Sequence, residues 1–169
     1  MSHPDLSRAR SKVVTWEDPS ISAAAMASLS GRELLQAIVD GRLPRPPIAE
    51  LFDARLVSIG EGSARFECTP DESTYNPIGL VHGGMLCTLL DSAAGCAVHT
   101  MLAPGVGYST IELKVSFLAA VRADTGTIEA EGRVLRLGRQ VAFAEAHART
   151  AGGKLVGHAT TSLALMRRE

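Results

Sequence analysis

Hydrophobic residues in the middle of the chain recur at intervals of three and four positions. This is the period of one face of an α-helix, and it predicts a single long helix over residues 85–102. Asp91 and His99 fall inside the stretch, which makes a membrane span an unfavourable interpretation. The residues that carry the pattern are Leu86, Leu89, Leu90, Ala93, Ala94, Ala97, Val98 and Met101.

Alternation of apolar and polar residues, which is typical of β-strands, dominates on both sides of this helix. Residues 51–59 and 63–69 flank a glycine-containing turn and predict a hairpin. Four further runs follow the helix, and in the first of them the odd positions from Ile111 to Phe117 are expected to face the core. Short turns favour antiparallel pairing, so the order predicts an α+β fold in which a mostly antiparallel sheet wraps a central helix. The four runs are residues 110–118, 126–137, 140–150 and 155–166.

The first fifty residues lack the alternating pattern of the later chain and predict a helical extension. The main domain is expected over residues 51–169. One short helix is expected over residues 20–29, behind Pro19. Ser30 and Glu33 have the spacing of a capping box and predict a second helix that ends near Gly41. The proline-rich residues 44–47 are interpreted as a stiff connector. This arm is either a lid or, as the general behaviour of apolar helical stripes favours, a packing element.

Composition narrows the function classes. The 169 residues carry a formal net charge of −1, from 17 Lys+Arg against 18 Asp+Glu, which disfavours a general nucleic-acid binder. One Trp, two Tyr and four Phe stand beside 16 Gly, so the core must be built from small side chains. Because a lone domain of this size gains limited burial from such a core, we expect a homo-oligomer.

The three cysteines are odd in number and lack C-x-x-C spacing, so they indicate neither a disulfide framework nor a zinc site. Cys87 and Cys96 lie on the apolar helix and are interpreted as core thiols. His99, His147 and His158 have no second ligand at helical or hairpin spacing, so no metal or other cofactor is expected. A basic segment followed by an apolar run, the pattern of a secretory signal, is not visible near the start, and we expect a cytoplasmic protein that does not bind membranes.

The strongest chemical signal lies at the mouth of the long helix, where residues 76–84 read NPIGLVHGG. Gly83 and Gly84 let a ligand approach the unpaired N–H groups of a helix start, an arrangement that suits an oxyanion. Asp91, inside the helix, is costly to bury unless it is paired or faces a cavity. The glycines could also simply form a turn, and the aspartate could be a satisfied structural group.

Spacing limits how these residues can cooperate. Gly84 and Asp91 are seven residues apart, so their backbones lie roughly 10 Å apart along one helix. A reacting carbon must sit ~3 Å from both the oxyanion donors and the base. If both residues are catalytic, the site therefore combines the glycines of one subunit with the aspartate of another, from two antiparallel helices.

The combined motif resembles the hotdog-fold thioesterases, specifically the PaaI-like group of the phenylacetate pathway. The resemblance covers roughly residues 51–166, and the arm is similar to the N-terminal extension of many bacterial members. It implies a hotdog fold, dimers or tetramers of hotdog subunits, and hydrolysis of acyl-coenzyme A thioesters. The residues that carry it are Asn76, His82, Gly83, Gly84, Asp91, Ser109, Thr110, Gly138 and Arg139.

The same resemblance implies a role for each matching position. Asp91 attacks the thioester or activates the water that does, and the Gly83 amide stabilises the oxyanion. His82 shapes the loop, Asn76 orients the substrate or water, and Ser109 supplies a hydroxyl that helps hold the water. Thr110, the next residue, is the alternative candidate for that hydroxyl. Substrate contacts are expected from Gly84, Thr110, Gly138 and Arg139, and Arg122 is a further candidate for the coenzyme A phosphates.

Two other functions remain open. A non-catalytic acyl-coenzyme A binder on the same fold would bind tightly without turnover. A hotdog enoyl-coenzyme A hydratase would need an Asp and a His close together at the thioester, whereas Asp91 and His99 lie two turns apart on one helix. A serine triad is not supported, because the chain contains no G-x-S-x-G.

Overall fold

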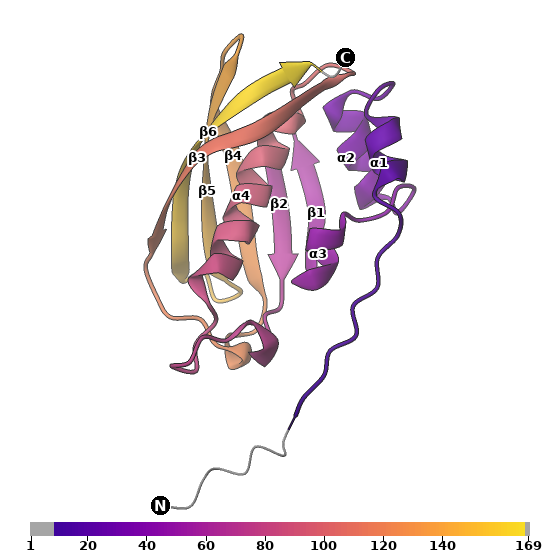
Figure 1. The fold of residues 1–169 in the computed structure, drawn as a ribbon. Helices are drawn as coiled ribbons and strands as arrows, with labels where there is room; N and C mark the ends of the chain where they lie inside the picture. Colours follow the sequence, from indigo (N-terminus) through magenta and orange to yellow (C-terminus); the bar gives the residue numbers. More distant parts are fainter. Residues whose placement is uncertain (1–8, 168–169) are drawn as a thin grey trace, which may run out of the picture.

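A computed structural model describes residues 9–167 and contains a six-stranded sheet around one long helix. Figure 1 shows the sheet curving around helix α4, with the short helices α1, α2 and α3 beside the β1 side of the sheet. The elements are α1 (Ser20–Ala25), α2 (Gly31–Val39), α3 (Pro47–Leu51), β1 (Ala54–Gly60), β2 (Ser63–Cys68), the 3-10 turn η1 (Glu72–Thr74), α4 (Gly83–His99), β3 (Val106–Phe117), the 3-10 turn η2 (Ala123–Thr125), β4 (Ile128–Leu137), β5 (Val141–Thr150) and β6 (Leu155–Arg167).

All strand pairs are antiparallel, in the order β1-β2-β4-β5-β6-β3. The predicted α+β fold, with a sheet wrapping a central helix, is therefore confirmed. Two strands lie at the edges of the sheet, and β3 pairs only with β6 within the described chain. The helices of residues 9–167 are all too short or too polar to cross a bilayer.

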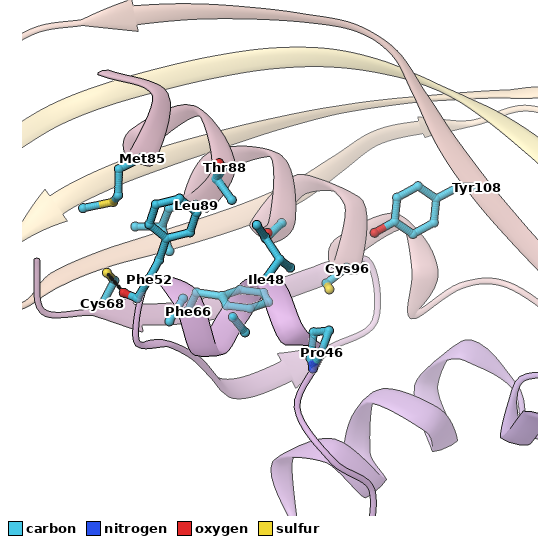
Figure 2. Close-up of a pocket in the computed structure, with 13 residues that line it drawn as sticks. Pro46, Ile48, Phe52, Phe66, Cys68, Met85, Thr88, Leu89, Cys96 and Tyr108 are labelled. Atoms are coloured by element: carbon cyan, nitrogen blue, oxygen red, sulfur yellow. Dashed lines mark hydrogen bonds between the residues drawn. The ribbon is translucent and has the colours of Figure 1, made fainter. Parts of the chain in front are cut away.

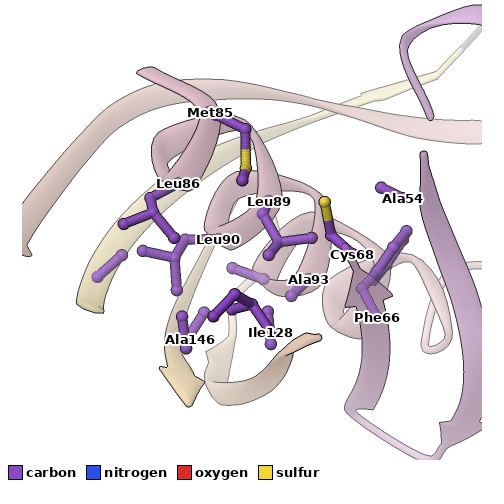
Figure 3. Close-up of a cluster of buried hydrophobic side chains, with 14 of the residues drawn as sticks. Ala54, Phe66, Cys68, Met85, Leu86, Leu89, Leu90, Ala93, Ile128 and Ala146 are labelled. Atoms are coloured by element: carbon purple, nitrogen blue, oxygen red, sulfur yellow. The ribbon is translucent and has the colours of Figure 1, made fainter. Parts of the chain in front are cut away.

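Small residues on the inner face of the sheet let the central helix come unusually close. Leu86, Leu89 and Leu90 of α4 point toward this face (Figure 3). A Cβ atom built on Gly132 of β4 would lie 2.1 Å from the carbonyl oxygen of Ala93, so helix and strand backbones touch there. The scarcity of aromatic residues thus has a structural reason. The fully buried alanines of the sheet are Ala130, Ala142, Ala144, Ala146, Ala148 and Ala159.

The backbone contact at Gly132 predicts a stability effect. A Gly132→Ala substitution forces α4 away from the sheet, because the new Cβ would meet only backbone atoms of Ala93 and Ala94, and we expect a loss of stability of about 2 kcal/mol or more. Urea unfolding of the two proteins measures this. Gly107→Ala in β3 is the matched control, since its Cβ would meet only the Met26 sulfur at 3.8 Å, and it should change stability little. Equal effects of the two substitutions would contradict the close-approach explanation.

The N-terminal arm differs from its prediction in its connector, in its boundary with the main domain and in its first helix. The proline-rich connector is in part a helix, because Pro46 caps α3 and Pro47 occupies its first position, where a missing N–H is tolerated. Helix α3 therefore spans the expected boundary at residue 50, and β1 begins at Ala54 rather than at residue 51. Helix α1 ends at Ala25, earlier than predicted, and hydrogen-bonded turns follow it before Ser30, the N-cap of α2. The capping box of Ser30 and Glu33 is confirmed.

The arm is anchored at the C-terminal end of α4. The Gly31 N–H donates to the Leu102 carbonyl at 2.9 Å, and a Cβ on Gly31 would collide with the His99 carbonyl oxygen at 1.8 Å. The His99 side chain is buried, stacks edge-on against Tyr108 at 5.7 Å, and has no hydrogen-bond partner for either ring nitrogen within the described residues. Burial lowers the pKa of His99 below its ordinary value.

This histidine predicts acid sensitivity. Its pKa is lower in the folded than in the unfolded chain, so the unfolded state takes up a proton first as the pH falls below about 6.5. Stability is therefore complete above that pH and is lost as the pH falls toward the folded pKa. Replacing His99 by leucine should remove this component and leave stability at pH 7 equal or about 1 kcal/mol higher, because an unpaired buried polar group disappears. Urea midpoints at pH 7 and pH 5 test it, and an unchanged acid loss in His99→Leu would contradict it.

Strand β3 does not bury all of the odd positions that were expected to face the core. Leu113 and Val115 pack against the core, but Ile111 is 61% exposed and Phe117 is 55% exposed. The pairing of β3 with β6 shifts between Thr110 and Glu112, and this irregularity breaks the simple alternation. Strand β3 also begins at Val106, four residues before its predicted start, because β6 extends far enough to pair with it.

Candidate active site

The N-terminus of α4 is capped by a histidine and leaves one amide free. His82 is the N-cap, and its Nδ1 accepts a hydrogen bond from the Gly84 N–H at 2.9 Å. The Met85 N–H donates to the His82 carbonyl oxygen at 3.0 Å. The Gly83 N–H, in contrast, has no acceptor among residues 9–167. A partly positive helix end with an unpaired donor is therefore available to a ligand.

The loop before the helix is held by an asparagine. The Oδ1 of Asn76 accepts from the Ile78 N–H at 3.1 Å and from the Leu80 N–H at 3.3 Å, and the Asn76 N–H donates to the Leu80 carbonyl oxygen at 2.8 Å. The side-chain oxygen is thus used to shape the loop. This leaves the Nδ2 amide of Asn76 as its group for contacting a ligand.

These residues border one surface hollow. Asn76, His82, Gly83 and Gly84 line one side, and residues 117–121 line the other. A Cβ on Gly83 would lie 2.8 Å from Cζ of Phe117, so the ring lies directly against this glycine. The sequence prediction that Asn76, His82 and Gly83 form one group matches this arrangement. The contribution of the Phe117 segment could not be predicted, because it depends on how β3 ends beside α4.

Asp91 forms a second group, two turns further along α4. The carboxylate is half-buried, and its Oδ1 accepts a hydrogen bond from the Thr110 hydroxyl of β3 at 2.9 Å. Ser109, whose side chain alternates to the other side of the strand, is exposed. Of the two neighbouring hydroxyls considered from the sequence, the structure therefore brings that of Thr110 to Asp91. The hydrogen bond orients the carboxylate and leaves its second oxygen available.

The two groups are far apart within one chain. Gly83 and Asp91 are both in the continuous helix α4, and eight residues at ~1.5 Å each separate them by roughly 12 Å along its axis. A single carbonyl carbon cannot lie ~3 Å from both. The structure of one chain thus contains an oxyanion donor and a carboxylate that cannot act together on the same carbonyl.

The cysteines of α4 are not activated thiols. Burial raises the pKa of Cys96 to about 12. Burial and the negative charge of Asp91 raise the pKa of Cys87. Both shifts disfavour the nucleophilic thiolate. Cys96 packs against the core as predicted, whereas Cys87 is half-buried and lies outside the core cluster.

The basic residues considered for coenzyme A lie at different ends of the sheet. Arg122 donates to the Gly79 carbonyl oxygen at 3.3 Å and so stands beside the Asn76 loop. Gly138 and Arg139 form the β4–β5 turn, where the Gly138 N–H donates to the Val141 carbonyl oxygen. This turn is at the end of the sheet that meets the C-terminus of α4, away from Gly83 (Figure 1). Arg139 itself is exposed.

A group of possible metal ligands lies on the opposite side of the sheet. His147 of β5 pairs directly with His158 of β6, and their ring centroids are 4.6 Å apart. Ligand atoms of these two residues and Glu145 all lie within 4.8 Å of one another. The prediction that these histidines lack a nearby second ligand is therefore wrong, because strand register, which the sequence did not reveal, places them side by side. They face away from α4, since their neighbours Ala146 and Ala148 are the buried positions.

Comparison with known proteins places the chain in a family. The model of the thioesterase superfamily matches residues 78–157. A protein from Saccharolobus solfataricus named "Putative esterase" is 31% identical over 120 residues, which are 71% of this chain and 84% of the relative. The chain belongs to the thioesterase superfamily. The family predicted from residues 76–91 is confirmed, and the motif that carried the prediction lies largely within the matched region.

Solved structures of this superfamily share the hotdog fold of the chain. The phenylacetic acid degradation-related protein of Ralstonia eutropha is 29% identical, with a TM-score of 0.71, over 77% of this chain and 98% of that protein. The PaaI protein from the phenylacetic acid degradation operon of E. coli is 22% identical, with a TM-score of 0.70, over 84% of this chain and 97% of that protein. The hotdog fold is thus confirmed.

Proposed function

We propose that this thioesterase-superfamily protein hydrolyses acyl-coenzyme A thioesters to a free acid and coenzyme A. The observation that carries the proposal is the unpaired Gly83 N–H at the start of α4. The Gly84 N–H donates to the His82 ring and the Met85 N–H donates to the His82 carbonyl oxygen, so the Gly83 N–H is left for an oxyanion. Asp91, oriented by Thr110, supplies the carboxylate that the reaction requires.

The chemistry needs only these two groups at the carbonyl. Asp91 either takes a proton from a water that attacks the thioester carbon or attacks that carbon itself, in which case a water then hydrolyses the acyl anhydride that forms on Asp91. The carbonyl oxygen becomes an oxyanion and accepts the Gly83 hydrogen bond. When the intermediate collapses, the carbon–sulfur bond breaks and coenzyme A leaves as a thiolate, which needs no strong acid to protonate it. Asn76 and His82 border the hollow beside Gly83 and orient the substrate or the water.

The proposal requires a homo-oligomer, because the donor and the carboxylate of one helix are too far apart. The free edge of β3 offers a place for a second copy, since a long exposed strand edge pairs readily with another chain. An antiparallel pair of β3 strands runs the two α4 helices antiparallel and side by side. Gly83 of one subunit then faces Asp91 of the other. Dimers of this kind, alone or assembled into tetramers, are the proposed active form.

The same dimer arrangement indicates which subunit contributes each cationic residue to the site. Arg122 stands beside the loop of the subunit that gives Gly83. Gly138 and Arg139 lie near the C-terminus of α4 and so come from the subunit that gives Asp91. We propose that these arginines contact the coenzyme A phosphates from the two sides. Ser109, on the exposed side of β3, is left to contact the water or substrate from the interface.

A panel of acyl-coenzyme A thioesters tests the function. Thiol release from acetyl-, hexanoyl-, phenylacetyl- and decanoyl-coenzyme A is followed with the purified oligomer, and at least one should turn over. Binding of an acyl-coenzyme A without thiol release would instead support the non-catalytic binder. Absence of both binding and turnover across the panel would contradict the proposal.

A further inference from the structure

An apolar cavity of about 180 Å³ lies between the N-terminal arm and α4. Figure 2 shows Pro46 and Ile48 of the arm on one side and Met85, Thr88 and Leu89 of α4 on the other, with Phe66 at the base. The remaining lining residues are Ala49, Phe52, Ala54, Cys68, Ser92, Cys96 and Tyr108. Cys68 donates its thiol proton to the Phe52 carbonyl at 3.0 Å, so this wall presents few free polar groups.

The wall of this cavity continues to the carboxylate of the proposed active site. Thr88 and Ser92, which line it, lie three residues before and one residue after Asp91 on α4. Tyr108, another lining residue, shares a strand face with Thr110, the partner of Asp91, at a distance of roughly 7 Å along β3. Burial raises the pKa of Tyr108 well above its ordinary value, and the negative charge of Asp91 adds to this shift.

We propose that this cavity receives the acyl group of the substrate and that helix α3 sets its length. The inference rests on the proposed function and adds the substrate class, an aryl ring or a medium alkyl chain. Apolar cavities of roughly 150 Å³ accept a benzene-sized ligand, so a group of about six carbons fits this one. An acetyl group would leave it largely empty, and a long alkyl chain would exceed it.

The arm supplies a part of the cavity wall that lies outside the family match. The matched region starts at residue 78, whereas Pro46, Ile48, Ala49 and Phe52 all precede it. Ala49 is buried against the core, and Ile48 is 45% exposed at the rim. The arm is therefore more than a packing element, because its third helix closes the space beside Asp91. Substitutions on this helix should alter which acyl group is preferred.

Two opposite substitutions test the proposal. Ala49→Leu adds volume inside the cavity and should lower kcat/KM for hexanoyl- and phenylacetyl-coenzyme A, relative to acetyl-coenzyme A, about tenfold. Ile48→Ala removes volume at the rim and should raise kcat/KM for decanoyl- relative to hexanoyl-coenzyme A by a similar factor. Leu51→Ala is the matched control, since Leu51 is exposed on the same helix and does not line the cavity.

The outcomes separate the two proposals. If the wild-type protein cleaves none of the thioesters, the proposed function fails. If it cleaves them but Ala49→Leu and Ile48→Ala keep the acyl preference of Leu51→Ala, the inference about the cavity is overturned and the function stands. Circular dichroism verifies that each variant folds. If Ala49→Leu does not fold, Ile48→Ala alone tests the role of the cavity, because the Ile48 side chain lies at the exposed rim.

Discussion

Replacing Asp91 by asparagine is expected to lower kcat for the preferred acyl-coenzyme A by about 100- to 10,000-fold, the usual contribution of a positioned base. Asparagine has the same shape and can still accept the hydrogen bond from Thr110 at its side-chain oxygen. The fold and the binding of substrate should therefore persist while proton removal and nucleophilic attack are lost. Thiol release under saturating substrate measures the effect, and KM should change far less than kcat.

The matched control is Glu131→Gln, the same chemical change on an exposed carboxylate of β4, away from the proposed subunit interface. It should keep wild-type kcat. If Asp91→Asn folds and keeps full activity, the aspartate has no role in the reaction and the proposed mechanism is wrong. A single turnover in isotopically labelled water then separates the two roles of an active Asp91. A direct general base puts the label into the product acid, whereas nucleophilic attack can deliver an oxygen of the carboxylate itself.

The parts of the fold that were predictable from sequence are those set by local chemistry. The helical period of residues 85–102 identified α4 because its apolar residues face the sheet along almost its whole length. The capping box at Ser30 and the turn at Gly62, which has a positive φ, were likewise visible in a few neighbouring residues. Each depends on contacts within a few positions of the chain.

The rest depends on contacts between distant segments. The choice between Ser109 and Thr110 depends on which face of β3 turns toward α4, and the shifted pairing next to Thr110 hides this from a simple alternation. The pairing of His147 with His158 depends on the register of two strands. The cavity beside Asp91 requires the arm to fold back over α4, through contacts such as that of Gly31 with Leu102.

The candidate site was therefore predictable as a set of residue types, and less so as an arrangement. Asn76, His82 and Gly83 are close in sequence and were expected together, and the structure places them around one hollow. The separation of this group from Asp91 also followed from the sequence, because Gly83 and Asp91 belong to one continuous helix. That separation makes the subunit arrangement the most consequential prediction of the mechanism.

Gly83→Pro isolates the proposed oxyanion donor. Proline removes the N–H, and it is tolerated at the first position of a helix. His82 already has the extended backbone that precedes proline, with φ −64° and ψ 136°. Gly83→Ala is the matched control, because it adds the same Cβ against Phe117 but keeps the N–H. The proline variant should fall about 100- to 1,000-fold below the alanine variant in kcat.

Mixing two inactive variants should restore activity if each site is shared between subunits. In a hybrid dimer of Asp91→Asn and Gly83→Pro chains, one site combines an intact Gly83 with an intact Asp91, and the other site carries both defects. Random pairing makes about half of the dimers hybrid, so we expect about a quarter of the wild-type activity in a two-fold symmetric assembly. The mixture is prepared by refolding the two chains together and is compared with each variant refolded alone.

The result distinguishes a shared site from a site within one chain. If Gly83 and Asp91 of the same chain acted on one carbonyl, every chain in the mixture would carry a defect and no activity would return. Recovery near a quarter therefore requires that the roughly 12 Å between these residues in α4 is bridged by a second copy of the helix. Size-exclusion chromatography of the mixture must show the wild-type oligomer, because failed assembly would also leave the sites incomplete. An assembled but inactive mixture would refute the two-subunit site and, with it, the functional reason for the oligomer.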